Sequence, residues 1–302
     1  MRIGLNLPHY GTLTDPETII EVSRGAEELG FDSLWTGDRL LSPLTPSDPY
    51  PGGDGTMPAE MGTYLDPLTA LTFAAAHTGR VRLGTSTLNA LFHPPVVLAR
   101  TLTTLDVLSR GRLTVGLGLG WLRDEYTAAG VGWSGRGARL DETLDLLDEI
   151  WTDEVVSHQD RHFTVPPSRI NPKPVQRPRP PILLAGFDPR ALRRVARRAD
   201  GWLAVGLPLP YLAGMWATIG RQAQEYGRDP AGLRMVQRLN PRLTDSPADP
   251  ARVPAYGTLT QVVDYAKAAN ADEVFVDLTL TARTADETLD IAGRFLAAMR
   301  AG

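Results

Sequence analysis

The sequence predicts an α/β protein of the (β/α)8-barrel type, the TIM barrel. Strand-like and helix-like segments alternate along the chain, eight strand-like segments are present, and 302 residues suit one barrel with insertions. A doubly wound parallel sheet is the alternative, because it alternates strands and helices in the same way. Both architectures pair their strands in parallel, so we expect functional residues at the carboxyl ends of strands. We expect residues 1–302 to form one domain.

The first half of the chain contains four strand–helix units. Strands are expected at residues 3–7, 33–36, 81–85 and 113–117. Asp15 caps the first helix, Pro16 occupies its first turn and Gly30 ends it. Further helices begin at Asp66-Pro67 and Pro94-Pro95. Residues 39–65 are rich in Pro and Gly without a periodic pattern, which predicts a long insertion after strand 2.

The second half repeats this alternation after a second insertion. Helices are expected at 121–130 and 140–151, followed by a small hairpin made of 155–158 and 162–165. A proline-rich connector leads to the remaining strands, at residues 182–185, 202–205, 235–239 and 273–278. The helices between and after them are expected from Asp188, over 211–226, and after two capping boxes, Thr258 with Gln261 and Thr284 with Glu287. The second insertion therefore lies between strands 4 and 5.

Composition excludes several classes of function. The net charge is −4, so we expect no nucleic-acid partner and no anionic membrane surface. The chain contains no cysteine, which excludes disulfides, thiolate metal sites and a cysteine nucleophile. The two lysines, Lys173 and Lys267, lie in a proline-rich connector and an outer helix, so we expect no Schiff base. The five histidines lack paired ligand spacing on a helix, so no metal is expected, and the chain start predicts a cytoplasmic protein.

Polar residues follow the first three predicted strands. His9 follows strand 1, where a histidine can donate a hydrogen bond or a proton, or simply pack at the barrel mouth. Asp38 and Arg39 follow strand 2, as a pair that holds the polar edge of a cofactor or as a salt-bridged loop. Small side chains at 85–89 follow strand 3 and permit the close approach of a flat ring.

Glycines follow strands 4 and 5 and precede helices. The segment 116–121 leaves backbone N–H groups free to face an anion, although its spacing differs from the dinucleotide fingerprint. Gly186 and Phe187 precede Asp188 and Pro189 in a similar arrangement. The next helix carries five arginines, which form either a solvated face or a patch for an acidic cofactor tail.

Taken together, these segments make the chain resemble the luciferase-like monooxygenase superfamily, and within it the branch that uses the deazaflavin coenzyme F420. The stretches that carry the resemblance are GFDSLW at 30–35, TLTTLDVLSRGR at 101–112, GLGLGWLRDEY at 116–126, NPKPVQRP at 171–178 and ADGW at 199–202. The resemblance implies a TIM barrel whose cofactor ring lies over the barrel mouth. It also implies a non-prolyl cis peptide at Ser86–Thr87, against the ring.

The resemblance carries several site residues over to this chain. It implies cofactor contacts by Asp38, Ser86, Thr87, Asn89, Gly120, Trp121, Asp124, Gly186 and Phe187. Members of the branch often have Asp-His after strand 2, whereas this chain has Asp38-Arg39. A general acid must then lie elsewhere, with His9 as one option, while Arg39 can stabilise negative charge on the ring because it does not release a proton near neutral pH. His9, Asp38 and Arg39 are therefore the candidate catalytic residues.

The leading functional hypothesis is an F420-dependent oxidoreductase that transfers a hydride between the cofactor and a small organic substrate. An FMN-dependent flavin monooxygenase is the first alternative, and a non-catalytic flavin-binding protein is the second. The loop at 39–65, with Tyr50, Met57, Met61 and Tyr64, is expected to cover the substrate side. By analogy with the superfamily, we expect a homodimer.

Overall fold

The computed structural model describes residues 1–301, and within them a closed barrel of eight parallel strands forms the centre of the molecule. Its strands are β1 (Arg2–Asn6), β2 (Ser33–Thr36), β3 (Arg82–Thr85), β5 (Leu113–Gly118), β8 (Ile182–Ala185), β9 (Gly201–Val205), β10 (Arg234–Leu239) and β13 (Glu273–Val276). Neighbours run in the order β3, β2, β1, β13, β10, β9, β8, β5, and pairing of β3 with β5 closes the ring. This closure confirms the barrel and excludes the open, doubly wound sheet.

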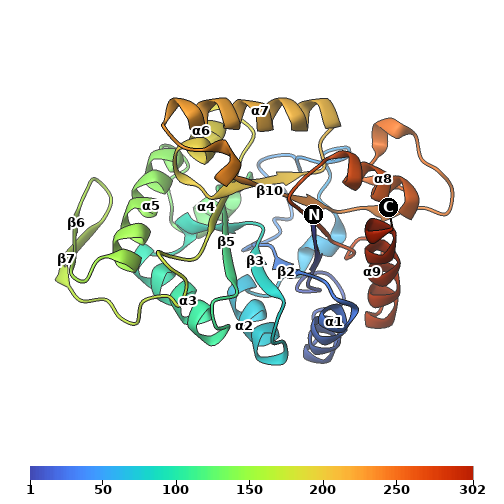
Figure 1. The fold of residues 1–302 in the computed structure, drawn as a ribbon, viewed down its shortest axis with the longest axis horizontal. Helices are drawn as coiled ribbons and strands as arrows, with labels where there is room; N and C mark the ends of the chain where they lie inside the picture. The colour runs from blue at the N-terminus through green and yellow to red at the C-terminus, as the bar shows by residue number, and fades with distance from the viewer. Residues whose placement is uncertain (302) are drawn as a thin grey trace.

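Helices surround the strands, as Figure 1 shows. They are α1 (Pro16–Leu29), α2 (Pro67–His77), α3 (Pro95–Leu108), α4 (Arg123–Ala128), α5 (Arg136–Thr152), α6 (Pro189–Arg198), α7 (Leu209–Glu225), α8 (Leu259–Ala268) and α9 (Ala285–Arg300). The short elements are η1 (Ala59–Gly62), η2 (Ala90–Phe92), η3 (Pro230–Gly232), η4 (Pro250–Arg252), and strands β4 (Leu88–Asn89), β6 (Val156–Gln159), β7 (Thr164–Ser168), β11 (Arg242–Leu243) and β12 (Tyr256–Gly257). No helix within residues 1–301 combines the length and the apolar character needed to cross a membrane.

Local sequence signals account for most helix boundaries. The Asp15 and Asp188 side chains accept backbone N–H groups of the first turns of α1 and α6, and Gly30 ends α1 in the left-handed conformation at φ 94°. The capping box at Thr258 is complete. The box expected at Thr284 is only half present, because the Glu287 carboxylate accepts the N–H of Arg283 instead of the cap N–H.

Two insertions were predicted, and a third was not. Residues 39–65 form the expected long loop, interrupted only by η1, and residues 156–168 form the expected antiparallel hairpin of β6 and β7. Helix α4 is shorter than predicted, and α5 begins four residues earlier, at Arg136. The segment between β10 and α8 holds β11, η4 and β12. Its short strands lacked a periodic pattern, so sequence analysis missed it.

A small cluster fills the barrel interior. It consists of Trp35, Leu183, Leu203, Val236 and Phe275. The Trp35 ring stacks on Phe275 with centroids 4.7 Å apart, and its Nε1 donates to Ser33 Oγ at 2.8 Å. The ring fits because β3 carries Gly84, at which a Cβ would meet Trp35 ring atoms at 2.4 Å. One tryptophan and one glycine thus determine how the strands close around their core.

Substitution of Gly84 tests this packing. Gly84→Ala is expected to lower the free energy of unfolding by about 1–3 kcal/mol, because the added methyl group overlaps a ring held on all sides. The measurement is the urea midpoint followed by circular dichroism. The control is Gly214→Ala on the exposed face of α7, where a Cβ meets open space and alanine favours the helix by up to about 1 kcal/mol. Equal midpoints for the two variants would show that the barrel interior accommodates the methyl group.

Candidate active site

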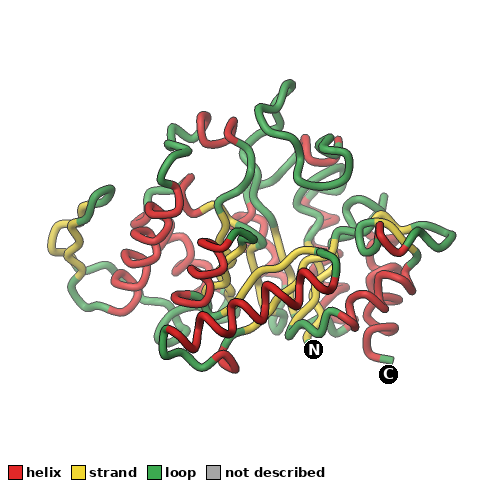
Figure 2. The backbone as a smooth tube through the Cα atoms, turned by 90° about the horizontal axis from the view of Figure 1, so that it is seen from above, coloured by secondary structure: helices red, strands yellow, loops and turns green. Residues whose placement is uncertain are grey.

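A cavity of about 2090 Å³ lies at the carboxyl ends of the barrel strands. Figure 2 shows the long loops gathered on the side of the strands away from the N-terminus, and residues of several loops line the cavity. Its lining comes from the segments that follow β2, β3, β5, β8, β9 and β10. Tyr50, Met57, Met61 and Tyr64 of the 39–65 loop also line it, as expected. The loop is attached to α4, because Asp124 accepts hydrogen bonds from the Ser47 N–H and hydroxyl at 2.9 and 3.0 Å.

Asp38 follows β2 and lies at the cavity wall. Its carboxylate accepts the backbone N–H of Asn89 at 3.0 Å, which joins the segments after β2 and β3. Burial raises the pKa of Asp38 to about 6, and the negative charge of Glu125 contributes to the rise. Asn89 in turn donates through Nδ2 to the Tyr126 hydroxyl at 3.2 Å. Asp38 is therefore a cavity group that changes charge close to neutral pH.

Arg39 presents a partly unsatisfied positive charge to the same cavity. Its side chain is only 8% exposed, and its Nη1 lies 3.8 Å from Glu125 Oε1. The guanidinium carbon lies 5.1 Å from the centroid of the Trp121 ring and 6.0 Å from that of Tyr64. Nε and Nη1 have no hydrogen-bond partner among residues 1–301. Both atoms are themselves buried, so the guanidinium keeps a partly uncompensated positive charge at the cavity wall.

A second buried arginine holds the segment after β3. The Ser86–Thr87 peptide bond is cis, as the resemblance implied. Arg238 on β10 donates from Nη1 to the Ser86 carbonyl at 2.8 Å and from Nη2 to Asp277 at 2.6 Å. Burial alone would lower the pKa of Arg238, but the Asp277 carboxylate beside it raises the pKa above the ordinary value. This ion pair fixes the cavity floor.

Asp277 is a shared acceptor below the cavity. It accepts hydrogen bonds from the Tyr10 hydroxyl at 2.9 Å and from Asn240 Nδ2 at 2.8 Å, besides the bond from Arg238. Sequence analysis missed Arg238, Asn240 and Asp277. Their position at the carboxyl ends of β10 and β13 was the signal that would have identified them, because both strands were predicted.

His9 does not line the cavity. Its Nδ1 lies 2.8 Å from the Leu7 carbonyl oxygen, which only accepts, so Nδ1 carries the proton and Nε2 accepts the Gly37 N–H at 2.8 Å. Burial lowers the pKa of His9 to about 4. The neutral ring therefore connects the ends of β1 and β2 and has no ring nitrogen left for a ligand.

The glycine segments after β5 and β8 border the other end of the cavity. Gly120 adopts φ 59°, and Gly186 adopts φ 152° beside Ala191, where a Cβ would meet the alanine Cβ at 2.3 Å. Trp121 and Phe187 line the same region. Of the arginines of α6, Arg190 and Arg194 line the cavity, and Arg194 also bonds Asp141 at 2.6 Å. The helix thus presents part of its arginine face to the cavity.

The structure brings nine of the eleven sequence-selected residues together around one cavity. They are Asp38, Arg39, Ser86, Thr87, Asn89, Gly120, Trp121, Gly186 and Phe187. His9 lies behind the wall, and Asp124 lies outside it, where it holds the 39–65 loop. Asp124 lies only three residues beyond Trp121 of the cavity wall, but its carboxylate, in the first turn of α4, bonds Ser47.

Comparison with known proteins gives a consistent assignment. The model of the luciferase-like monooxygenase family matches residues 2–294. An F420-dependent glucose-6-phosphate dehydrogenase of Amycolatopsis mediterranei is 31% identical over 192 residues, which are 62% of this chain and 53% of that protein, so the match spans about half of its length.

Solved structures share the fold. The monooxygenase RslO1 from Streptomyces bottropensis superposes with a TM-score of 0.81 and 24% identity, over 99% of this chain and 98% of that one. An F420-dependent secondary alcohol dehydrogenase in complex with an F420–acetone adduct superposes with a TM-score of 0.79 and 17% identity, over 99% of both chains. At these identities the likeness concerns the fold.

The raised pKa of Asp38 predicts a pH-dependent stability difference. In the folded protein the pKa is about 6, above the value of about 3.9 expected in the unfolded chain, so the folded state binds the proton more tightly. Stability from this group is present at low pH and is lost as pH rises from about 4 to 6. Asparagine does not titrate, so Asp38→Asn does not lose this stability. The free energy of unfolding of the variant minus that of wild type should therefore rise by about 2 kcal/mol between pH 4 and pH 7.

Urea unfolding of both proteins across this pH range makes the measurement. The lowered pKa of His9 has the opposite effect in the same window, since its stabilisation is lost as pH falls from about 6.5 toward 4. His9 is present in both proteins, so its contribution cancels in the difference. A difference that stays constant with pH would contradict the raised pKa of Asp38.

Proposed function

This chain belongs to the luciferase-like monooxygenase family, and from that premise we propose that it is an oxidoreductase that transfers a hydride between coenzyme F420 and a small organic substrate. The main observation that supports this proposal is the volume of the cavity. A volume of about 2090 Å³ exceeds the roughly 300–1,000 Å³ of an ordinary small-molecule site, so it has room for a cofactor and a substrate together. The similarity to an F420-dependent dehydrogenase supports the choice of cofactor.

The residues around the cavity fit a flat ring with an anionic tail. Ser86, Thr87 and Asn89 have short side chains and would lie against the ring. Gly118 leaves space beside them, because a Cβ there would meet Thr87 Oγ1 at 2.5 Å. Gly186, at the N-terminus of α6, would hold the anionic tail through backbone N–H groups, with Arg190 nearby. When bound, the deazaflavin supplies the hydride from carbon 5 of its ring.

The protein's own contribution is electrostatic and positional. The positive charge of Arg39 would stabilise negative charge on the ring or the substrate from the cavity wall. Asp38, with a pKa of about 6, is the better candidate than His9 for proton exchange with a bound molecule, because His9 is occupied on both ring nitrogens. The 39–65 loop, with Tyr50 and Tyr64, would exclude water from the substrate.

The alternative is an FMN-dependent monooxygenase, favoured by the close fold similarity to RslO1. The two proposals differ in the reaction of the cofactor with oxygen, since a deazaflavin carries carbon at position 5 and reacts poorly with O2. They therefore predict different cofactor affinities and different products.

Titration of cofactor-free protein with oxidised F420 and separately with FMN tests the choice. We expect tight F420 binding and weak FMN binding, followed by fluorescence and calorimetry. Anaerobic bleaching of F420 with candidate alcohols, aldehydes and ketones then identifies the substrate class. Tight FMN binding with oxygen consumption would instead support the monooxygenase. Retention of F420 without turnover of any candidate would support a binding protein.

Arg39→Gln provides a sharper test of the cavity. The dissociation constant for F420 should rise about tenfold or more, because a unit charge at about 4 Å from an opposite charge contributes on the order of 1–4 kcal/mol near a protein surface, and the variant removes that charge from the cavity wall. The matched control is Arg294→Gln, since Arg294 lies exposed on α9 and should leave the affinity unchanged. An unchanged affinity in the Arg39 variant would mean that its guanidinium does not contact the cofactor.

A further inference from the structure

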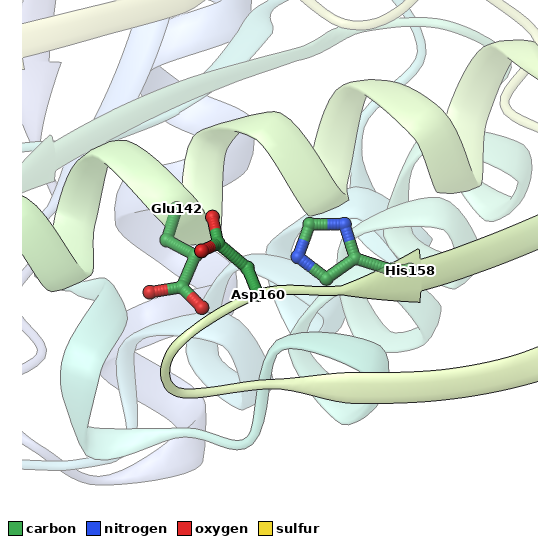
Figure 3. Close-up of side chains that lie close together, drawn as sticks. All are labelled: Glu142, His158 and Asp160. Atoms are coloured by element: carbon green, nitrogen blue, oxygen red, sulfur yellow. The ribbon is translucent and has the colours of Figure 1, made fainter.

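A second cluster of charged side chains lies in the insertion between β5 and β8. Figure 1 shows β6 and β7 at the left edge of the molecule, beyond α5 and away from the barrel. Glu142 on α5, His158 on β6 and Asp160 in the hairpin turn each offer one ligand atom, and these atoms lie within 4.8 Å of one another. Figure 3 shows the three side chains close together between the helix and the hairpin. None of the three lines the cavity of the candidate active site.

The orientation of His158 is the central observation. Its Nδ1 lies 3.1 and 3.0 Å from the two carboxylate oxygens of Glu149 on α5, so Nδ1 carries a proton. Nε2 is buried and has no hydrogen-bond partner within residues 1–301, and the side chain is 8% exposed. In Figure 3 the ring nitrogen away from the helix faces Glu142 and Asp160. A buried polar atom without a partner costs free energy, so a ligand bound to this nitrogen would be stabilising.

Glu142 is held in place from its other side. Its Oε1 accepts the backbone N–H groups of His162 and Phe163 at 2.7 and 3.2 Å, and its Oε2 bonds the ring of His162. These bonds come from the chain just before β7, so they connect α5 to the hairpin. The carboxylate is therefore ordered before any ligand binds.

The negative charges around this point are only partly compensated, since His162 contacts Glu142 and His158 contacts Glu149, while Asp160 forms no salt bridge within residues 1–301. Glu142, Glu149 and Asp160 contribute three carboxyl groups, while the imidazole directs a lone pair at two of them when only Nδ1 is protonated. Carboxylate oxygens and an imidazole lone pair repel each other at short range unless a cation lies between them.

We propose that Glu142, Nε2 of His158 and Asp160 bind a divalent transition-metal ion, with Zn²⁺ as the best match. One imidazole nitrogen with two carboxylate oxygens is a donor set that suits Zn²⁺, whereas Mg²⁺ and Ca²⁺ prefer oxygen ligands alone. Glu149 positions the imidazole through its Nδ1–H, as carboxylates commonly do for histidines that bind metals. The ion fastens the hairpin to α5, whose first turn lines the main cavity.

Zinc titration of chelator-treated, tag-free protein tests the site, with calorimetry to give stoichiometry and affinity. We expect one Zn²⁺ per chain. Asp160→Asn should weaken binding by about tenfold or more, because it removes a charged ligand, and Asp160 is exposed, so the variant should fold normally. Glu154→Gln is the matched control, since it removes one negative charge just before β6 and should bind Zn²⁺ as wild type does.

Two further readouts separate a built site from surface binding. Glu149→Gln should keep the stoichiometry but weaken Zn²⁺ binding by about 10–100-fold, through loss of the imidazole orientation. Zn²⁺ should also slow amide exchange in residues 156–168 of wild type and not of the Asp160 variant. Absence of stoichiometric binding, equal affinity in wild type and Asp160→Asn, or protons on both His158 ring nitrogens when Zn²⁺ is present would overturn the proposal.

Discussion

The stacking of Trp35 on Phe275 inside the closed ring is the packing contact on which the rest of the molecule depends. Eight parallel strands enclose little space, and the tryptophan ring occupies it because Gly84 leaves room. Closure brings the carboxyl ends of all eight strands to one side. Residues far apart in the chain, such as Asp38, Ser86 and Arg238, thereby line a single cavity.

Two arginines at this end of the barrel have opposite roles. Arg238 donates through Nη1 to the Ser86 carbonyl and through Nη2 to the Asp277 carboxylate, and so stabilises the cavity floor, while its Nε has no partner within residues 1–301. The Arg39 guanidinium lies 5.1 Å from the Trp121 ring and 6.0 Å from the Tyr64 ring, and two of its buried nitrogens have no hydrogen-bond partner within residues 1–301, so its charge is less compensated. The two arginines differ in the distance to their nearest carboxylate. Arg238 lies within hydrogen-bond distance of Asp277, whereas Arg39 approaches Glu125 only to 3.8 Å.

The insertion between β5 and β8 is held in place by contacts that do not involve the cavity. Its hairpin contributes Val156 and Val165 to the hydrophobic core, and polar contacts of Glu142 and Glu149 with His162 and His158 also join it to α5. A metal ion bound at the proposed site would add to this packing, because an ion that binds the folded state stabilises that state. Helix α5 contacts the hairpin and also lines the cavity with its first turn. A well-ordered hairpin therefore stabilises this part of the cavity wall.

The sequence by itself determined the barrel, most of its helix caps and several residues of the cavity wall, because these depend on local patterns and on the rule that parallel strands end on one side. Asp38 and Arg39 were found in this way, whereas the role of Asn89 was implied by the family resemblance. Only the tertiary structure decided the rest. Whether His9 faces a ligand depends on the Gly37 N–H of the neighbouring strand, and the free edge of Arg39 depends on its distance from Glu125. Contacts between segments far apart in the chain leave no periodic trace in the sequence, which is the physical reason that pattern alone did not reveal them.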